Sequence, residues 1–200
     1  MIMNILAFSD THLNEKAVKS IIKKSEKADI LICAGDISWF GTGLKKILHM
    51  LDSQIQKPIY IIPGNHEEGE PLEEICKPLK NVQCVNRKIK KIDDILFFFW
   101  GGGGFARTDP KLEAATNQFQ RILKKEDKVV FVTHGPPYQT PLDYLEWAGH
   151  VGCKSRKRFI TIIRPILHIS GHLHEHMHEH AMLGKTILVN PGPDGTLLEL

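Results

Sequence analysis

Three observations predict an α/β fold for this chain of 200 residues. Its N-terminal part alternates short apolar runs with amphipathic segments, which is the order of strand, helix, strand, helix and strand. Its middle has closely spaced apolar runs with short polar joins, as hairpins do. Several apolar runs also end in Asp, Asn or His. The opening alternation implies parallel strands that are joined by right-handed crossovers.

The N-terminal part supplies three strands and two helices. Apolar runs that stop at polar residues predict the strands, and apolar residues on one face predict the helices. In chain order we expect these five elements at 4–9, 17–27, 29–34, 44–51 and 58–62. The first helix has Ala17, Val18, Ile21 and Ile22 on one face, which predicts that this face is buried.

The remaining elements follow from the same patterns. Antiparallel hairpins are expected over the strands at 82–85, 88–92 and 95–100. Helices are expected at 111–125 and 156–164, and further strands at 128–133, 166–169, 185–189 and 196–200. The segment 136–152 is predicted to be a long surface loop, and its length beside polar strand ends favours contact with a substrate.

Composition favours one ordinary globular domain over residues 1–200, with 42% hydrophobic and 24% charged residues. The longest apolar runs, such as Ile95 to Trp100, are far shorter than the ~20 residues of a membrane span. The N-terminus has no basic start and no small-residue cleavage site, so we expect a first strand and not a signal peptide. The cysteines have no C-x-x-C spacing, which favours reduced thiols. We therefore expect a cytoplasmic protein without membrane contact.

Charge gives little indication of a macromolecular partner. The formal net charge of +3 is too small to imply nucleic-acid binding. The basic run from Lys154 to Arg158 is predicted to be a solvated helix face. Nucleic acid stays open as a partner, and the oligomeric state is not determined by the sequence.

Polar residues with metal-binding chemistry follow five of the predicted strands. They are Asp10-Thr-His12, Gly35-Asp36, Gly64-Asn65-His66-Glu67, Thr133-His134 and Gly171-His172-Leu173-His174. The carboxyl ends of parallel strands face one crevice, so we expect these side chains to converge there. Carboxylate, amide and imidazole together suit a pair of first-row divalent metals.

These motifs, in this order and over nearly the whole chain, resemble those of the calcineurin-like metallophosphoesterases. The resemblance implies a four-layer αββα sandwich, in which helices flank two mixed β-sheets. It also implies that Asp10, His12 and His174 hold one metal and that Asn65, His134 and His172 hold the other, with Asp36 bridging both. Mn²⁺ is the metal most expected, and Fe, Ni, Co and Zn remain open.

The expected activity is that of a dinuclear metal-dependent phosphoesterase. Two cations can activate a bridging hydroxide for attack and clamp a phosphoryl group. By the resemblance, Asp36 and His66 are the catalytic residues, and His66 contacts the phosphate and protonates the leaving group. Asn65 is expected beside the substrate. Glu67 is expected either to orient His66 or to be an exposed loop acid.

Departures from related groups narrow the choice. Trp39 occupies the position of the tyrosine in ferric-tyrosinate members, and the arginines of the phosphoprotein phosphatases are absent from 37–43 and 67–69. The segments 133–137, 149–153 and 189–193 are similar to the small single-domain, MPPED-like branch, which includes phosphodiesterases. A small phosphodiester or cyclic nucleotide is therefore the expected substrate, with His150 as a further contact from the long loop. A nuclease that acts on RNA or DNA ends and a metal-stabilised protein-binding scaffold are the alternatives.

A histidine tract continues beyond the motif, with His176, His178 and His180 at alternate positions. This alternation predicts an outgoing strand with all of these rings on one face. No other motif requires the three histidines. We therefore expect only His172 and His174 of the tract to bind metal.

Overall fold

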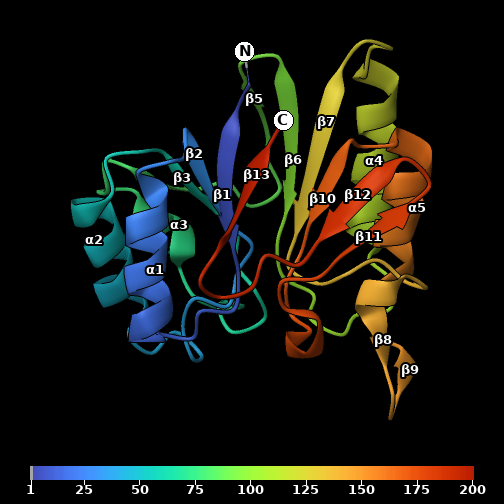
Figure 1. Ribbon diagram of the computed structural model, residues 1–200. Helices are drawn as coiled ribbons and strands as arrows, with labels where there is room; N and C mark the ends of the chain where they lie inside the picture. The colour runs from blue at the N-terminus through green and yellow to red at the C-terminus, as the bar shows by residue number, and fades with distance from the viewer. Residues whose placement is uncertain (1) are drawn as a thin grey trace.

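The computed structural model describes residues 2–200 and has four layers, helices, sheet, sheet and helices (Figure 1). One outer layer contains α1, α2 and α3 (Glu15–Ser25, Leu44–Gln54 and Leu72–Cys76). The other contains α4 and α5 (Pro110–Ile122 and Lys154–Ile163). This arrangement confirms the predicted αββα sandwich of two mixed sheets. Within residues 2–200, no helix has both the length and the apolar surface that a membrane crossing needs.

The first sheet is parallel except at one edge. Its order is β13-β1-β2-β3-β4 (Thr196–Glu199, Asn4–Phe8, Ile30–Cys33, Ile59–Ile61 and Val82–Cys84). Only β13 is antiparallel to its neighbour. The prediction that β4 belongs to a hairpin is therefore wrong. The short helix α3, which the sequence analysis missed, is the crossover that makes β4 parallel to β3.

The second sheet has a parallel centre and antiparallel edges. Its order is β11-β12-β10-β7-β6-β5 (His180–Leu183, Thr186–Val189, Leu167–Ile169, Lys128–Thr133, Ile95–Trp100 and Ile89–Ile92). The pair β5 and β6 is the one predicted hairpin that forms, with Ile92 opposite Ile95. The predicted long loop contains a further small hairpin of β8 and β9 (Tyr144–Leu145 and Gly149–His150), which projects from the body in Figure 1.

The core between the sheets is formed by strand residues that point inward at alternate positions. Ile5 and Ala7 of β1 meet Phe97 and Phe99 of β6 in this layer, and all four are fully buried. The outer faces of the sheets pack on the helices, for example Phe8 of β1 with residues of α1 and α2. Both faces of each sheet are therefore covered, which explains the nearly continuous apolar runs.

Polar side chains cap the starts of α1 and α4. The Asn14 side chain accepts hydrogen bonds from the N–H groups of Lys16 and Ala17 at the start of α1. Asp109 caps α4 in the same way, and Pro110 follows at the first helical position. Because Asn14 follows the first polar motif closely, this cap also fixes where the chain leaves the end of β1.

Candidate metal centre

The register of the strands brings the polar motifs to one edge of the molecule. In the first sheet Phe8 pairs with Cys33, and Cys33 pairs with Ile61, so β1, β2 and β3 end at the same level. In the second sheet Val132 of β7 pairs with Ile169 of β10. The loops that follow these five strands lie together at the lower edge in Figure 1.

A first group of side chains comes from the loops after β1 and β10. Asp10, His12 and His174 offer ligand atoms that all lie within 4.8 Å of one another. The Nε2 atom of His174 is 3.6 Å from Oδ1 of Asp10. The nearby carboxylate of Asp10 raises the pKa of His174 above its ordinary value. One carboxylate and two imidazoles form a set that a first-row divalent metal can bind.

A second group comes from the loops after β2, β7 and β10. The ligand atoms of Asp36, His134 and His172 also lie within 4.8 Å of one another. The Nε2 atom of His134 is 3.2 Å from Oδ2 of Asp36 and 2.9 Å from Oδ1 of Asn65. The amide oxygen of Asn65 therefore joins this group. Burial alone would lower the pKa of His134, but its contact with Asp36 raises it on balance.

Asp36 lies between the two groups. Its Oδ2 atom is 3.9 Å from Nε2 of His12 and 3.2 Å from Nε2 of His134. Its Oδ1 atom accepts a hydrogen bond of 2.9 Å from the backbone N–H of His66. Burial favours a raised pKa for Asp36, but His134 and the His66 N–H lower it overall. The carboxylate is thus ionised at neutral pH and within reach of both groups.

Backbone carbonyls orient two of the imidazole rings. His12 Nδ1 lies 3.0 Å from the Ser38 carbonyl oxygen, and His134 Nδ1 lies 2.9 Å from that of Ala34. A carbonyl only accepts, so Nδ1 carries the proton and donates it to this bond. Nε2 is then the ring nitrogen that can bind a metal, and in both residues it faces Asp36. Metal-binding histidines are commonly oriented by such a hydrogen bond.

The backbone is strained where these side chains attach. Left-handed φ angles of 57°, 41°, 53° and 73° occur at Asp10, His12, Asp36 and His172. This region is uncommon for residues other than glycine, and such strain clusters at functional sites. Close approach also requires glycine, because a Cβ at Gly64 would collide with Asp36 and a Cβ at Gly171 would collide with Asp10.

The chemistry of the donor atoms fits divalent metal ions. Asp10 Oδ1 and His172 Nε2 are buried and have no hydrogen-bond partner within residues 2–200. Burial and the charge of His134 lower the pKa of His172 to about 3. Burial would raise the pKa of Asp10, but His174 and His134 lower it to about 2. A neutral imidazole and a carboxylate are the protonation states that bind cations.

His66 lies beside the centre, next to Asp36. Its Nε2 atom is 3.8 Å from Oδ2 of Asp36. Its ring is perpendicular to that of Trp39 and lies 4.2 Å from that of Phe40, measured between centroids. Its Nδ1 atom is buried without a hydrogen-bond partner in the described chain. This imidazole therefore lies close to the centre, and its Nδ1 atom makes no hydrogen bond to the described chain.

Glu67 has a role that the sequence analysis missed. It is 1% exposed, so it is not an exposed loop acid, and its hydrogen bonds go to the backbone and to Ser38, not to His66. One carboxylate oxygen accepts from the N–H groups of Asp36 and Gly64, at 2.8 and 3.0 Å. The other accepts from the N–H and hydroxyl of Ser38, at 3.0 and 2.7 Å. Glu67 thereby fixes the loops after β2 and β3 relative to each other.

His150 lies on β9, apart from the two ligand groups. Its Nδ1 atom is 2.7 Å from Oδ1 of the buried Asp143. Its other ring contacts are with Tyr138 and Tyr144, at 6.0 and 5.3 Å between centroids. The structure therefore does not bring His150 into contact with a predicted metal ligand, and its substrate role stays a prediction.

The histidine tract does not form the predicted continuous strand. His174–His176 is a single turn of 3-10 helix, η2, and β11 begins only at His180. The chain turns because His172 and His178 both have left-handed φ angles. His176 instead contacts Glu179 and the Tyr144 carbonyl, at 2.7 and 2.8 Å. None of the ligand groups found within residues 2–200 includes His176, His178 or His180.

The basic run on α5 is only partly a solvated face. Arg156 is 3% exposed, which corrects the prediction for this residue. Its guanidinium donates a 2.9 Å hydrogen bond to the Gly102 carbonyl and lies against Gly135, the residue after His134. Burial lowers its pKa. Arg156 thus supports two loops beside the metal ligands, which no sequence pattern indicated.

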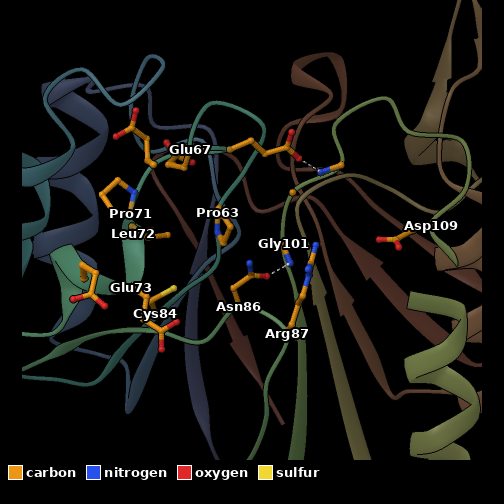
Figure 2. A pocket seen from close by; sticks show the side chains of 16 residues that line it. Pro63, Glu67, Pro71, Leu72, Glu73, Cys84, Asn86, Arg87, Gly101 and Asp109 are labelled. Carbon is orange, nitrogen blue, oxygen red and sulfur yellow. Dashed lines mark hydrogen bonds between the residues drawn. The ribbon is translucent and has the colours of Figure 1, made fainter. Parts of the chain in front are cut away.

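A separate cleft of about 470 Å³ lies between the segment from Pro63 to Glu74 and the glycine loop after β6 (Figure 2). Glu67, Arg87 and Asp109 are among its lining residues, and Asn86 accepts a 2.9 Å hydrogen bond from Gly101 N–H. None of the predicted metal ligands within residues 2–200 lines it. Its link to the centre is Glu67, which lines the cleft and also contacts the loop of Asp36.

Several known proteins are similar to this chain in sequence or in fold. The family model described as calcineurin-like phosphoesterase matches residues 3–176. The uncharacterized protein MJ1162 of Methanocaldococcus jannaschii is 29% identical, over 96% of this chain and 88% of that protein. Human metallophosphoesterase domain-containing protein 1 is 26% identical, over 91% of this chain and 63% of that protein. The crystal structure of TT1561 of Thermus thermophilus matches with a TM-score of 0.76 at 17% identity, over 99% and 94% of the two chains.

The family match includes every side chain of the two ligand groups. It covers well over half of the chain, and the fold agrees with that of the similar solved structure. The predicted resemblance to metallophosphoesterases is thereby confirmed. Together with side chains that can hold divalent metal ions, these findings show that the chain belongs to the calcineurin-like phosphoesterase family.

Proposed function

We propose that the protein is a dinuclear metal-dependent phosphodiesterase for a small phosphodiester or cyclic nucleotide. The observation that supports this most directly is the position of Asp36 between two groups of ligands. Asp10, His12 and His174 would hold one metal, and Asn65, His134 and His172 the other, with Asp36 in contact with both. Mn²⁺ is the first choice, although mixed imidazole and carboxylate sites also accept Fe, Ni, Co and Zn.

The side chains of this chain have distinct parts in the reaction. When bound, the two metals would supply Lewis acidity and lower the pKa of a water molecule. Asp36 would hold the two ions at a fixed separation, and the carbonyl-oriented rings of His12 and His134 would limit movement of the ligands. His66 would donate a hydrogen bond to the phosphate and then a proton to the leaving oxygen, which is general acid catalysis.

The surroundings of His66 favour a diester over a monoester. A phosphate monoester carries two negative charges, whereas a diester carries one charge and a second organic group. Two of the rings that contact His66 belong to Trp39 and Phe40 and carry no charge. Apolar contacts of this kind suit a second organic group.

The decisive experiment compares the wild type with His66→Asn on adenosine 2′,3′-cyclic phosphate and on bis-p-nitrophenyl phosphate in the presence of Mn²⁺. We expect the variant to fold and to keep both metals. It should lose about 10²- to 10⁴-fold in kcat on adenosine 2′,3′-cyclic phosphate, whose alkoxide leaving group needs a proton, and less on bis-p-nitrophenyl phosphate, whose leaving group departs as an anion. Metal stoichiometry and melting temperature are the controls. Unchanged turnover of the cyclic phosphate in the variant would remove His66 from the mechanism.

The same experiment separates enzyme from scaffold. A wild-type protein that binds two metals but hydrolyses neither diesters nor monoesters would contradict the proposed activity and favour a binding role. A preference for p-nitrophenyl phosphate over the diester would contradict only the diester assignment. The basic run from Lys154 to Arg158 was the feature that suggested a nuclease. It supports that alternative less well because Arg156 is buried and cannot contact a phosphate backbone.

A further inference from the structure

Three large aromatic side chains at the metal centre face solvent. Trp39 is 48% exposed, Phe40 73% and Phe105 57%. They come from two loops, one after β2 and one after β6, and we call them the aromatic collar. Exposed apolar side chains are normal when they are scattered singly, but a group of large rings around one site marks a binding surface.

Each ring of the collar contacts a histidine of the site. Trp39 is stacked on His12, with centroids 4.0 Å apart and an interplanar angle of 21°. Phe105 contacts the edge of His172, with centroids 4.3 Å apart. These two histidines belong to different ligand groups. The collar therefore contacts both ligand groups.

The third ring, Phe40, contacts His66 at 4.2 Å between centroids. Its backbone has a left-handed φ of 48°, which is strained for a bulky residue. Such strain persists only where other interactions hold the residue in place. Burial does not compensate for it, because the side chain is mostly exposed. A strained and exposed aromatic residue beside His66 is better explained by a ligand than by stability.

We propose that the aromatic collar binds a planar aromatic group of the substrate, a nucleobase or an aryl ring, and thereby sets its preference. This rests on the proposed function, because the ring would be carried by the phosphodiester that His66 contacts. A flat ring can stack on an exposed ring of the collar such as Trp39. An alkyl group has no flat face and therefore cannot stack.

The test compares two diesters that share p-nitrophenolate as the leaving group. Bis-p-nitrophenyl phosphate retains an aryl group, and methyl p-nitrophenyl phosphate retains a methyl group. We expect Trp39→Ala to lower the ratio of their kcat/KM values about 5- to 50-fold relative to the wild type. Trp39→Phe should keep most of the ratio, because it keeps a ring. Phe40→Ala and Phe105→Ala should lower the ratio in the same direction.

A matched control is Trp147→Ala, since Trp147 is an exposed tryptophan at the tip of the β8–β9 hairpin. It should leave the ratio unchanged, and an equal loss there would overturn the assignment to the collar. Metal stoichiometry and melting temperature should match the wild type in Trp39→Phe. If the wild type hydrolyses neither diester, the proposed function fails; if it hydrolyses both and no collar variant changes the ratio, only the collar fails.

A binding measurement identifies the source of the ring without turnover. Calorimetry with the Mn²⁺-loaded protein would compare phenylphosphonate with methylphosphonate, and adenosine 5′-monophosphate with ribose 5-phosphate. Loss of the adenosine preference in Trp39→Ala would assign a nucleobase. Loss of the phenyl preference alone would assign an aryl group. Equal affinities within both pairs in the wild type would overturn the proposal.

Discussion

His168, in the middle of β10, is a fully buried imidazole outside the metal-binding groups. Its Nε2 atom is 2.9 Å from the hydroxyl of Thr133, and its Nδ1 atom has no hydrogen-bond partner in the described chain. Burial and the nearby charge of Arg156 lower the pKa of His168 to about 3. In the unfolded chain its pKa returns to the ordinary value of 6.5. The unfolded state therefore takes up a proton first as the pH falls.

This difference predicts that acid destabilises the fold through His168. The stability it contributes is complete above pH 6.5 and is lost as the pH falls towards 3, by about 2 kcal/mol between pH 7 and pH 5. In His168→Gln the free energy of unfolding should fall less between pH 7 and pH 5, by about that amount, because glutamine does not titrate. Urea unfolding of the metal-free protein at both pH values measures it. The control is His49→Gln, on the exposed face of α2, which should show the same fall between the two pH values as the wild type. An equal fall in the two variants would contradict the prediction.

The positions of the candidate ligands at the strand ends could be predicted from the sequence, and the family resemblance implied their assignment to two metals, whereas their supporting residues could not be predicted. Each candidate ligand lies within about five residues of the end of an apolar run, so the end of a strand limits its position. Glu67 and Arg156 act through burial and backbone contacts that depend on which loops meet. Such contacts join residues far apart in the chain, and no local pattern records them. Arg156 in particular occurs within a run of basic residues that resembles a solvated surface.

At the scale of elements, the histidine tract changes its role where the strand is interrupted. From the end of η2 onwards, His176 and His178 contact neighbouring segments. His176 contacts the Tyr144 carbonyl on β8, and His178 lies 2.9 Å from Asp194 in the loop before β13. Asp194 also pairs with Lys24 of α1 at 2.9 Å. These exposed pairs contribute little to stability individually.

Replacement of His176, His178 and His180 together with Gln should leave kcat/KM for bis-p-nitrophenyl phosphate within a few-fold of the wild type. The two bound metals should also remain, because none of these rings belongs to a ligand group found within residues 2–200. His172→Gln is the comparison, and it should lose metal as measured by elemental analysis. A fall in activity as large as that of His172→Gln would show that the whole tract binds metal.

Elements with strong periodicity were predicted within a few residues. The helix expected at 111–125 is Pro110–Ile122, and the strands at 95–100 and 128–133 agree at both ends. The failures have physical reasons. Strand β4 is only three residues long, and its partner is decided by α3 and by packing. The β8–β9 hairpin has two residues in each strand, too few for an alternating pattern.

For the whole molecule, the sequence alone predicted an α/β fold, and the four layers came from the family resemblance. Strand patterns do not say which of two sheets a strand joins, because both sheets bury apolar residues on both faces. The substrate is undetermined for a similar reason. We propose that its preference depends on exposed rings such as Trp39 and Phe40, which lie in a loop whose shape no local pattern predicts.

Metal removal should destabilise the whole fold. Ions that bind only the native state raise the free energy of unfolding by RT ln(1 + [M]/Kd). This is about 2.7 kcal/mol when the free metal concentration is a hundred times Kd. For a chain of this size that corresponds to a rise in melting temperature of about 5–10 °C. Calorimetry with EDTA and with Mn²⁺ measures this rise. Asp36→Asn should show a smaller rise than the wild type, and identical melting with EDTA and with Mn²⁺ would contradict metal binding.

The ligands come from both sheets, with Asp10 and Asp36 following strands of one sheet and His134 and His172 following strands of the other. Two backbone hydrogen bonds also cross at this edge, from Ser9 N–H to the Gly192 carbonyl and from Gly102 N–H to the Pro63 carbonyl. Sliding of one sheet over the other would change the separations between ligands. Bound ions would therefore couple the opening of the two halves, so that β2 and β10 exchange their amide hydrogens as one cooperative unit.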